Sequence, residues 1–351
     1  MQVWLYSAAA DSIFILAPAF VVTLGAVIFA SWFPASATAS PLMWLMLVVG
    51  VDVAHVYSTL YRTYLDREES RRYHGLLFGV PIACWVGGVI LYSAGSMAFW
   101  RVLAYLAVFH FVRQQYGFLR LYARRERQTV FRRRVEGAAI YLATLYPLIY
   151  WHTHARHFSW FLEGDFFHLP FPLLERAAMA AYVLALGGYA AVNIRCANWP
   201  KHLVLAGTAL SWYTGIVVYD GDLIFTATNV VAHGVPYMAL VWFHERKKSG
   251  RSGGFFRPGM LPLYLGFLVA LAYFEEGLWD VLVWRDHMQF YHWLAFLPQV
   301  QEPGLVALLV PLLAVPQATH YVLDGFIWRI RGGGLPYGST ARNVSMSSGL
   351  M

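Results

Sequence analysis

Four histidines lie inside apolar stretches of this chain: His55 in VDVAHVYSTLY, His110 in VFHFVRQQYGF, His233 in NVVAHGVPYMA and His320 in QATHYVLDGFIW. Ionisable side chains are rare and costly in such surroundings, and they commonly mark functional sites there. A single imidazole could serve only to hydrogen-bond one helix to another. Four of them favour a shared metal site over that explanation.

Each of these histidines has polar or charged residues about one helical turn away, on the same helix face. They are Asp52 for His55; Arg113 and Gln114 for His110; Asn229 and Tyr237 for His233; and Gln317 and Asp324 for His320. A ligating histidine usually gives its second ring N–H to such a group, which fixes its tautomer. We therefore expect these residues to support the ligands, with helix packing as the alternative, and we expect Arg113 to pair with Asp52 or Asp324.

The donor types indicate which metal would bind. Imidazoles without thiolates suit iron, copper or zinc, and Cys84 lies on a stretch without a matched histidine. The HxxxH and HxxHH boxes of integral-membrane desaturases are absent from the sequence. A dinuclear site would need carboxylates, and Asp52 and Asp324 are the candidates for that role. Haem ligation by a pair such as His55 and His233, a proton relay and a histidine-lined metal transporter stay open.

The remaining histidines are peripheral, and His152, His154 and His157 form the cluster HTHARH. This spacing is loose for a metal site in a short loop. We expect these three residues to lie at a membrane interface or to contact partners within the protein.

The elements that must position the four histidines are apolar helices. Hydrophobic residues make up 59% of the chain and charged residues only 13%, about half the usual level for a soluble domain. Ten stretches approach the roughly 20 residues needed to cross a bilayer. They cover 12–33, 41–65, 75–96, 99–122, 135–152, 176–194, 202–219, 222–243, 259–283 and 304–328. The sequence therefore predicts an all-α, polytopic membrane bundle as one domain over residues 1–331, with a disordered cytoplasmic tail over 332–351.

All four histidines lie on even-numbered stretches, which would cross the membrane in the same direction. Counted from the same end, their positions differ by about four residues, or about 6 Å along a helix. Imidazoles at one depth on neighbouring parallel helices can converge on one ion. A transport path would favour staggered depths instead.

The basic residues predict the orientation. Of 26 lysines and arginines, 21 fall in the segments that follow even-numbered stretches. The positive-inside rule places these segments, and both termini, in the cytoplasm of an inner or plasma membrane. The net charge of +7 is therefore a topology signal, and it does not indicate nucleic-acid binding. Residues 1–11 hold no basic residue, so the first stretch is expected to be a retained helix and not a signal peptide.

At these histidines the chain resembles the Brp/Blh family of membrane beta-carotene dioxygenases. That family has single histidines in separate spans, and the similar segments here are those around His55, VFHFVRQQ, AHGVPY and AVPQATHYVLDGFIWR. The chain departs from the family pattern in about two extra spans, in Tyr237 where the family has a further histidine, and in closer spacing of His320 and Asp324.

The resemblance implies ferrous iron held by histidines and O₂-dependent cleavage of a polyene. We accordingly expect an iron oxygenase with O₂ and a hydrophobic, carotenoid or other unsaturated lipid as substrates. Tyr237 and Tyr321 are the candidates to orient O₂ or substrate. A haem or redox electron-transfer protein is the alternative.

Overall fold

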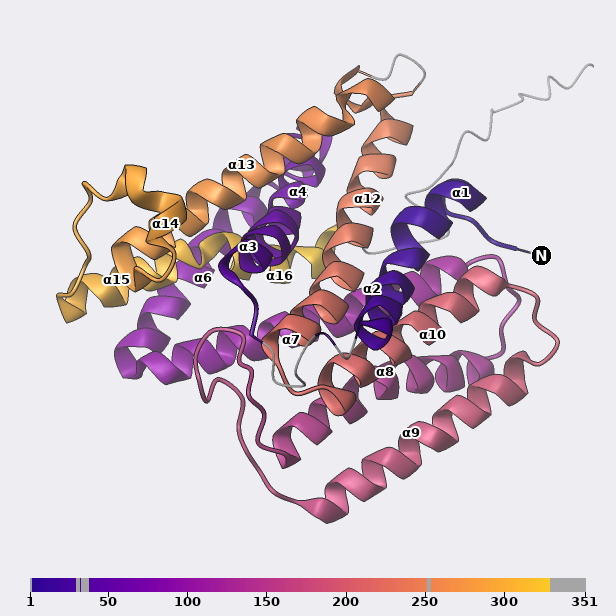
Figure 1. Cartoon of the computed structure of the whole chain (residues 1–351). Coiled ribbons are helices and arrows are strands. Elements are labelled where there is room, and N and C mark those ends of the chain that lie inside the picture. Colours follow the sequence, from indigo (N-terminus) through magenta and orange to yellow (C-terminus); the bar gives the residue numbers. More distant parts are fainter. Residues whose placement is uncertain (1, 30–31, 33–37, 251–253, 329–351) are drawn as a thin grey trace, which may run out of the picture.

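The computed structural model describes residues 2–29, 32, 38–250 and 254–328, and every regular element in these ranges is helical (Figure 1). The fold class is therefore all-α, as predicted. The tail predicted over 332–351 lies outside the described residues.

Ten helical segments follow the ten predicted stretches, several of them built from consecutive elements. Their bounds are α1 (Ala8–Asp11), η1 (Ser12–Leu16) and α2 (Ala17–Ile28); α3 (Pro41–Trp44), η3 (Leu45–Val53) and α4 (Ala54–Arg62); α6 (His74–Ala94); α7 (Ser96–Tyr122); α8 (Val130–Thr153); α9 (Pro172–Asn193); α10 (Trp199–Trp212) and η4 (Tyr213–Val218); α11 (Asp222–Phe225), η5 (Thr226–Val230) and α12 (Val231–Lys248); η7 (Pro258–Met260), α13 (Leu261–Trp279) and η8 (Asp280–Trp284); and α15 (Pro303–Leu313) with α16 (Val315–Ile327). Short elements join them: α5 (Arg67–Arg72), η6 (Gly254–Phe256), α14 (Met288–Tyr291) and η9 (His292–Leu294).

Five helices of the described chain are long and apolar enough to cross a membrane: Ala8–Ile28, Pro41–Arg62, His74–Ala94, Asp222–Lys248 and Pro258–Trp284. The pair α15 and α16 adds a sixth if the two helices, bent by 41°, form one span. The predicted count of ten spans is thus not confirmed. Charged residues within α7 to α10, such as those of the RRR run at 132–134, lower the hydropathy of the remaining segments.

Apolar side chains cover much of the outer surface of these helices. Leu24 on α2, Ile90 on α6 and Leu184 on α9 are each more than half exposed. Large exposed apolar surfaces are typical of contact with a protein partner or with membrane lipid. The helical composition is consistent with a membrane protein.

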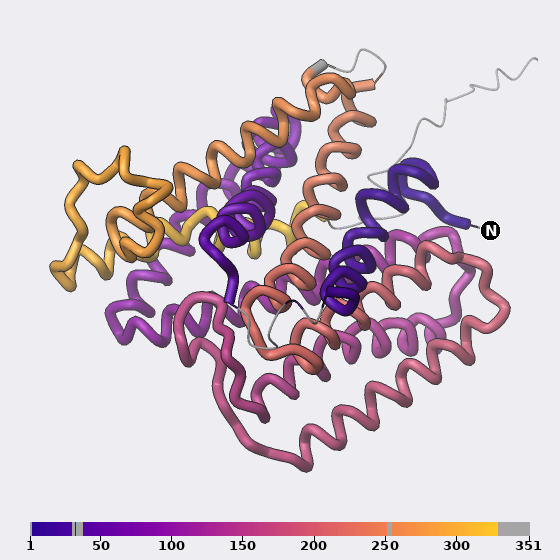
Figure 2. Tube along the Cα trace, viewed as in Figure 1, coloured from indigo at the N-terminus to yellow at the C-terminus, as the bar shows by residue number. Residues whose placement is uncertain are grey.

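The helices pack around a centre formed by non-consecutive parts of the chain. Segment α4 contacts both α12 and α16, and α16 also contacts α7. Figure 1 shows helices α4, α12 and α16 in the central part of the molecule, while α9 runs along one edge beside α8. In Figure 2 the first helical segment, in indigo, passes close to α12, and its element α2 packs against both α12 and α10. Each central helix carries one of the four histidines His55, His110, His233 and His320.

Helix irregularities lie directly before three of these histidines. The π-helical element η3 precedes His55, η5 precedes His233, and the bend between α15 and α16 precedes His320. Pro316 contributes to the bend because it lacks a backbone N–H. Such π-helical insertions are frequent at functional sites, where they turn a side chain away from its regular direction.

Candidate metal centre

The four histidines meet at one point in the protein interior. The Nε2 atom of His233 lies 3.1 Å from that of His55 and 3.2 Å from that of His110, whose Nε2 lies 3.1 Å from that of His320. One ligand nitrogen from each residue lies within 4.8 Å of all the others. Each side chain is at most 3% exposed. We call His55, His110, His233 and His320 the four-histidine cluster.

Hydrogen bonds among neutral imidazoles do not account for this arrangement. The Nε2 atoms of His110 and His233 each face two other ring nitrogens. A ring nitrogen carries either one hydrogen or one in-plane lone pair, so it cannot serve two such neighbours in the same way. A central cation accepts one lone pair from each ring. Separations of 3.1–3.2 Å between ring nitrogens are of the size expected for neighbouring ligands of one metal ion, given metal–imidazole bonds of about 2.0–2.1 Å.

The outer nitrogens of the rings meet different partners. The Nδ1 atom of His320 lies 2.7 Å from Thr59 Oγ1, which is the shortest of these contacts. Nδ1 of His110 is 3.6 Å from Asp324 Oδ2, and Nδ1 of His55 is 3.7 Å from Asp52 Oδ1. Thr59 was missed in the sequence interpretation, although it follows His55 by four residues and so lies on the same helix face.

Tyr237 and Asp324 complete a hydrogen-bonded group beside the cluster. The Tyr237 hydroxyl lies 3.0 Å from Thr59 Oγ1 and donates to Asp324 Oδ1 at 2.5 Å. Asp324 Oδ1 is also 3.9 Å from His320 Nδ1. Together Thr59, Tyr237 and Asp324 hold two of the four imidazoles, those of His110 and His320, from one side.

The other predicted supporting residues act on the backbone or lie elsewhere. Gln114 donates to the His233 carbonyl at 2.9 Å, and Asn229 donates to the Phe225 carbonyl at 3.1 Å within the π-helical turn before His233. Gln317 lines a cavity next to the cluster. These contacts position the helix that carries His233, and they do not reach its ring nitrogens.

The expected pairing of Arg113 with Asp52 or Asp324 is wrong. Arg113 is exposed, donates to the Tyr141 hydroxyl and lies 5.3 Å from the Tyr116 ring centroid. Residues three apart on a helix are still about 60° apart around its axis. That rotation, together with the burial of His110, is enough to turn Arg113 onto the outer face of α7.

A cavity of about 670 Å³ adjoins the cluster. Phe111 and Tyr321 separate the two: the Phe111 ring stacks on His233 at 3.7 Å, and the Tyr321 ring centroid lies 5.2 Å from that of His110. Aromatic residues form much of the remaining wall, namely Trp44, Trp100, Trp160, Phe161, Phe225, Trp279 and Trp284. Ligand cavities commonly have this size and character.

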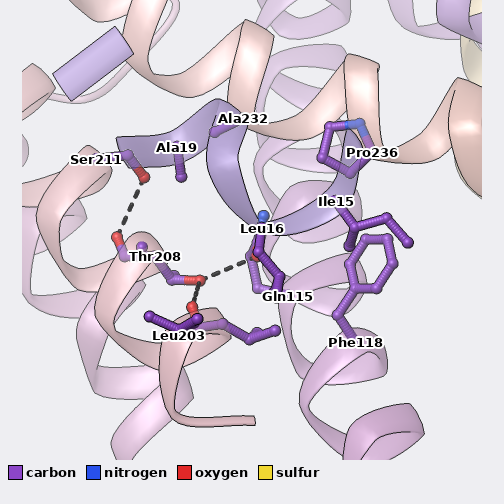
Figure 3. Close-up of a pocket in the computed structure, with 12 residues that line it drawn as sticks. Ile15, Leu16, Ala19, Gln115, Phe118, Leu203, Thr208, Ser211, Ala232 and Pro236 are labelled. Carbon is purple, nitrogen blue, oxygen red and sulfur yellow. Dashed lines mark hydrogen bonds between the residues drawn. The ribbon is translucent and has the colours of Figure 1, made fainter. Parts of the chain in front are cut away.

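A second cavity, between α2, α7, α10 and α12, measures only about 20 Å³ (Figure 3). Thr208 Oγ1 lies 3.0 Å from Gln115 Oε1 and 2.8 Å from the Val204 carbonyl oxygen, and its single hydrogen can be donated to either acceptor. The volume is enough for about one water molecule. We therefore assign this cavity to helix packing.

The HTHARH residues bind separate partners. His152 contacts the Tyr105 hydroxyl at 2.6 Å, His154 stacks on Tyr150, and His157 contacts Asp220 at 2.7 Å. Among the described residues, the four-histidine cluster is the group of histidines, cysteines and carboxylates whose geometry fits a metal ion.

No family model, no curated protein and no solved structure matches this chain. The resemblance to the Brp/Blh family therefore rests on the four sequence segments alone. The functional interpretation therefore rests on the arrangement of the four buried histidines. This cluster could hold a metal ion within an all-helical, membrane-type protein.

Proposed function

We propose that this protein is a membrane-embedded, non-haem iron oxygenase that acts on a hydrophobic, unsaturated lipid such as a carotenoid. The observation that carries the proposal is the convergence of four buried imidazole nitrogens within 4.8 Å. The motif resemblance supplies the expectation of ferrous iron and O₂. In the proposed topology, both termini are cytoplasmic.

The residues around the cluster suit this chemistry. The four-histidine cluster would hold ferrous iron through neutral imidazoles, and iron bound there would supply the activation of O₂. The chain's own contribution is to hold the rings and to shape the substrate space. Thr59 and Asp324 orient His320 and His110, while the aromatic part of the cavity wall beyond Tyr321 and Phe111 would contact a flat apolar chain.

The geometry disfavours the haem alternative. A porphyrin fills the equatorial positions of its iron with its own nitrogens, which leaves room for two axial histidines on opposite faces. Four imidazole nitrogens packed within 4.8 Å occupy that space themselves. The level positions of the histidines also argue against a transport path.

Metal analysis tests the centre. We expect purified protein to bind one metal ion and to show no Soret band. Replacing His55, His110, His233 or His320 with Ala should reduce bound metal at least tenfold. The control His152→Ala should retain it, because His152 contacts Tyr105 instead. Equal metal content in all five variants would exclude the cluster as the binding site.

Turnover tests the reaction. Iron-loaded protein in detergent should consume O₂ only when an unsaturated lipid is present, and the products should contain oxygen at a former double bond. Protein that holds iron in the cluster but oxidises none of a panel of carotenoids and polyunsaturated lipids would refute the oxygenase assignment.

A further inference from the structure

The large cavity beside the cluster is strongly acidic. Five carboxylate residues line it: Asp52, Asp222, Glu276, Asp280 and Asp286. Its described lining contains no lysine or arginine to neutralise them. We call this space the acidic cavity. An apolar substrate does not require so many carboxylates, and clefts lined by one sign of charge concentrate ions of the opposite sign.

The position of the acidic cavity relates it to one side of the membrane. Its lining includes Trp160 and Phe161 before α9, Asp222 at the start of α11, and Asp286 and His287 after η8. All of these lie in or beside connections that follow odd-numbered helical segments, and the charge distribution assigns those connections to the outer face. The cavity therefore extends from the outer side towards the cluster.

The opposite side of the cluster carries a hydrogen-bonded group, made of Tyr237, Asp324 and Trp328, and a guanidinium. The Tyr237 hydroxyl, engaged with Asp324, also accepts from Trp328 Nε1 at 3.4 Å. The Arg62 guanidinium stands over the Trp328 ring, 5.4 Å from its centroid. A metal ion arriving from this side would meet a hydrogen-bonded group and a guanidinium that is already paired with Glu69 at 3.6 Å. On the cavity side it meets carboxylates that have no lysine or arginine beside them in the described lining.

One carboxylate oxygen of Asp280 indicates that a ligand binds in this cavity. Its side chain is only 3% exposed and lines the acidic cavity. Oδ1 accepts from the His287 backbone N–H at 2.6 Å, but Oδ2 is buried without a hydrogen-bond partner among the described residues. Unpaired buried carboxylate oxygens are costly, and a cation would satisfy this one. At the inner end of the cavity, Asp52 lies 3.7 Å from His55 Nδ1.

We propose that the acidic cavity is the route by which a divalent transition-metal ion reaches the four-histidine cluster from the outer side. Asp280 and Glu276 bind the ion in transit, and Asp52 receives it next to His55. Because the histidines are at most 3% exposed, the last step requires movement of Phe111 or Tyr321, which separate the cavity from the cluster. The inference rests on the metal centre and the topology of the proposed function but not on its oxygenase activity.

Loading kinetics test this route. Metal-free protein in an uncharged detergent is mixed with Co²⁺, and the absorption of histidine-bound Co²⁺ is followed with time. The double variant Glu276→Gln/Asp280→Asn removes both negative charges but keeps the shapes of the two side chains. The Asn side chain retains an oxygen that can accept from the His287 N–H. We expect the double variant to load about tenfold more slowly than wild type at low ionic strength, with the same amount of Co²⁺ bound at equilibrium. The control Glu163→Gln, an exposed change in the connection between α8 and α9 that does not line the cavity, should load at the wild-type rate.

Salt provides a readout that needs no variant. The wild-type loading rate should fall as ionic strength rises, and it should fall less steeply in the double variant. Equal loading rates in wild type and the double variant, or a wild-type rate that does not change with salt, would overturn the route. Normal Co²⁺ loading along this route, combined with iron-bound protein that oxidises no lipid, would refute the oxygenase proposal and leave this one standing.

Discussion

At the scale of single residues, the two ring nitrogens face different groups in three of the four imidazoles. The Nε2 atoms face one another, while the Nδ1 atoms of His110, His320 and His55 face Asp324, Thr59 and Asp52. Thr59 is the closest of these partners, and it also contacts Tyr237. A hydroxyl that joins a ligand histidine to a tyrosine fixes the rotation of both rings.

Removing the Thr59 hydroxyl should therefore weaken metal binding without creating a cavity in the core. We expect Thr59→Val to lower metal affinity about 10- to 100-fold, the usual cost of losing an outer-sphere partner, and Thr59→Ser to restore most of it. Competition titration with a chromogenic chelator measures the affinities. The control is Thr63→Val, because Thr63 donates only to the Thr59 carbonyl one turn away. Wild-type affinity in Thr59→Val would contradict the positioning role.

At the scale of elements, the cluster depends on close approach of α12 to the η3–α4 segment. Gly234, next to His233, makes that approach: a Cβ atom there would lie 2.9 Å from Val51 Cγ1 and 3.1 Å from the Val51 carbonyl oxygen. A backbone carbonyl cannot rotate away as a side chain can. The distance between His233 and His55 is thus set by a glycine at a helix crossing.

Gly234→Ala should push α12 away from η3 and separate these two ligands. We expect a loss of about 1–3 kcal/mol in stability from overpacking, together with lower metal occupancy. Gly266→Ala on α13 is the matched control, since a Cβ there meets nothing within 4 Å and alanine favours the helix. Thermal unfolding and metal content of both variants provide the comparison. The interpretation fails if Gly234→Ala behaves like Gly266→Ala.

At the scale of the whole molecule, a charged network joins α7, α8, α9 and α10 at the side that is cytoplasmic in the proposed topology. Lys201 is fully buried and donates to Glu126 at 2.8 Å and to Glu136 and Asn193 at 2.7 Å each. Arg132 binds Glu126 and Glu136 as well. Because every charge has an opposite partner, the network can connect four helices that are less apolar than the others.

Glu126 makes the stability of this network depend on pH. Burial alone would raise its pKa, but hydrogen bonds from Lys201 and Asn198 outweigh burial and lower the pKa of Glu126 to about 2. A lowered folded-state pKa stabilises the protein above the ordinary value of about 4.5, and that stabilisation is lost as pH falls towards 2. Glu126→Gln should thus cost about 1–2 kcal/mol near pH 7 and progressively less below pH 4.5.

Thermal unfolding of wild type and Glu126→Gln in detergent, from pH 7 to pH 3, measures this difference. Glu163→Gln controls for the loss of an exposed carboxylate. A difference between wild type and Glu126→Gln that stays constant over the whole range would show that the charge of Glu126 does not stabilise the fold.

The sequence by itself determined the helical class and the depth of the four histidines. Helix rise and the length of apolar stretches fix how far along its helix a residue lies, so His55, His110, His233 and His320 could be placed at one level. The structure brings them together as that level position implies.

Only the tertiary structure decided what surrounds the histidines, because spacing along one helix does not fix its rotation or its neighbours. Arg113 turned outward to Tyr141, although its spacing from His110 matched the pattern of a supporting residue. Thr59, on the helix of His55, contacts His320 from a segment 261 residues away in sequence. The acidic cavity likewise combines carboxylates from η3, α11, α13 and η8, and the carboxylate of Asp286, which local sequence patterns do not connect.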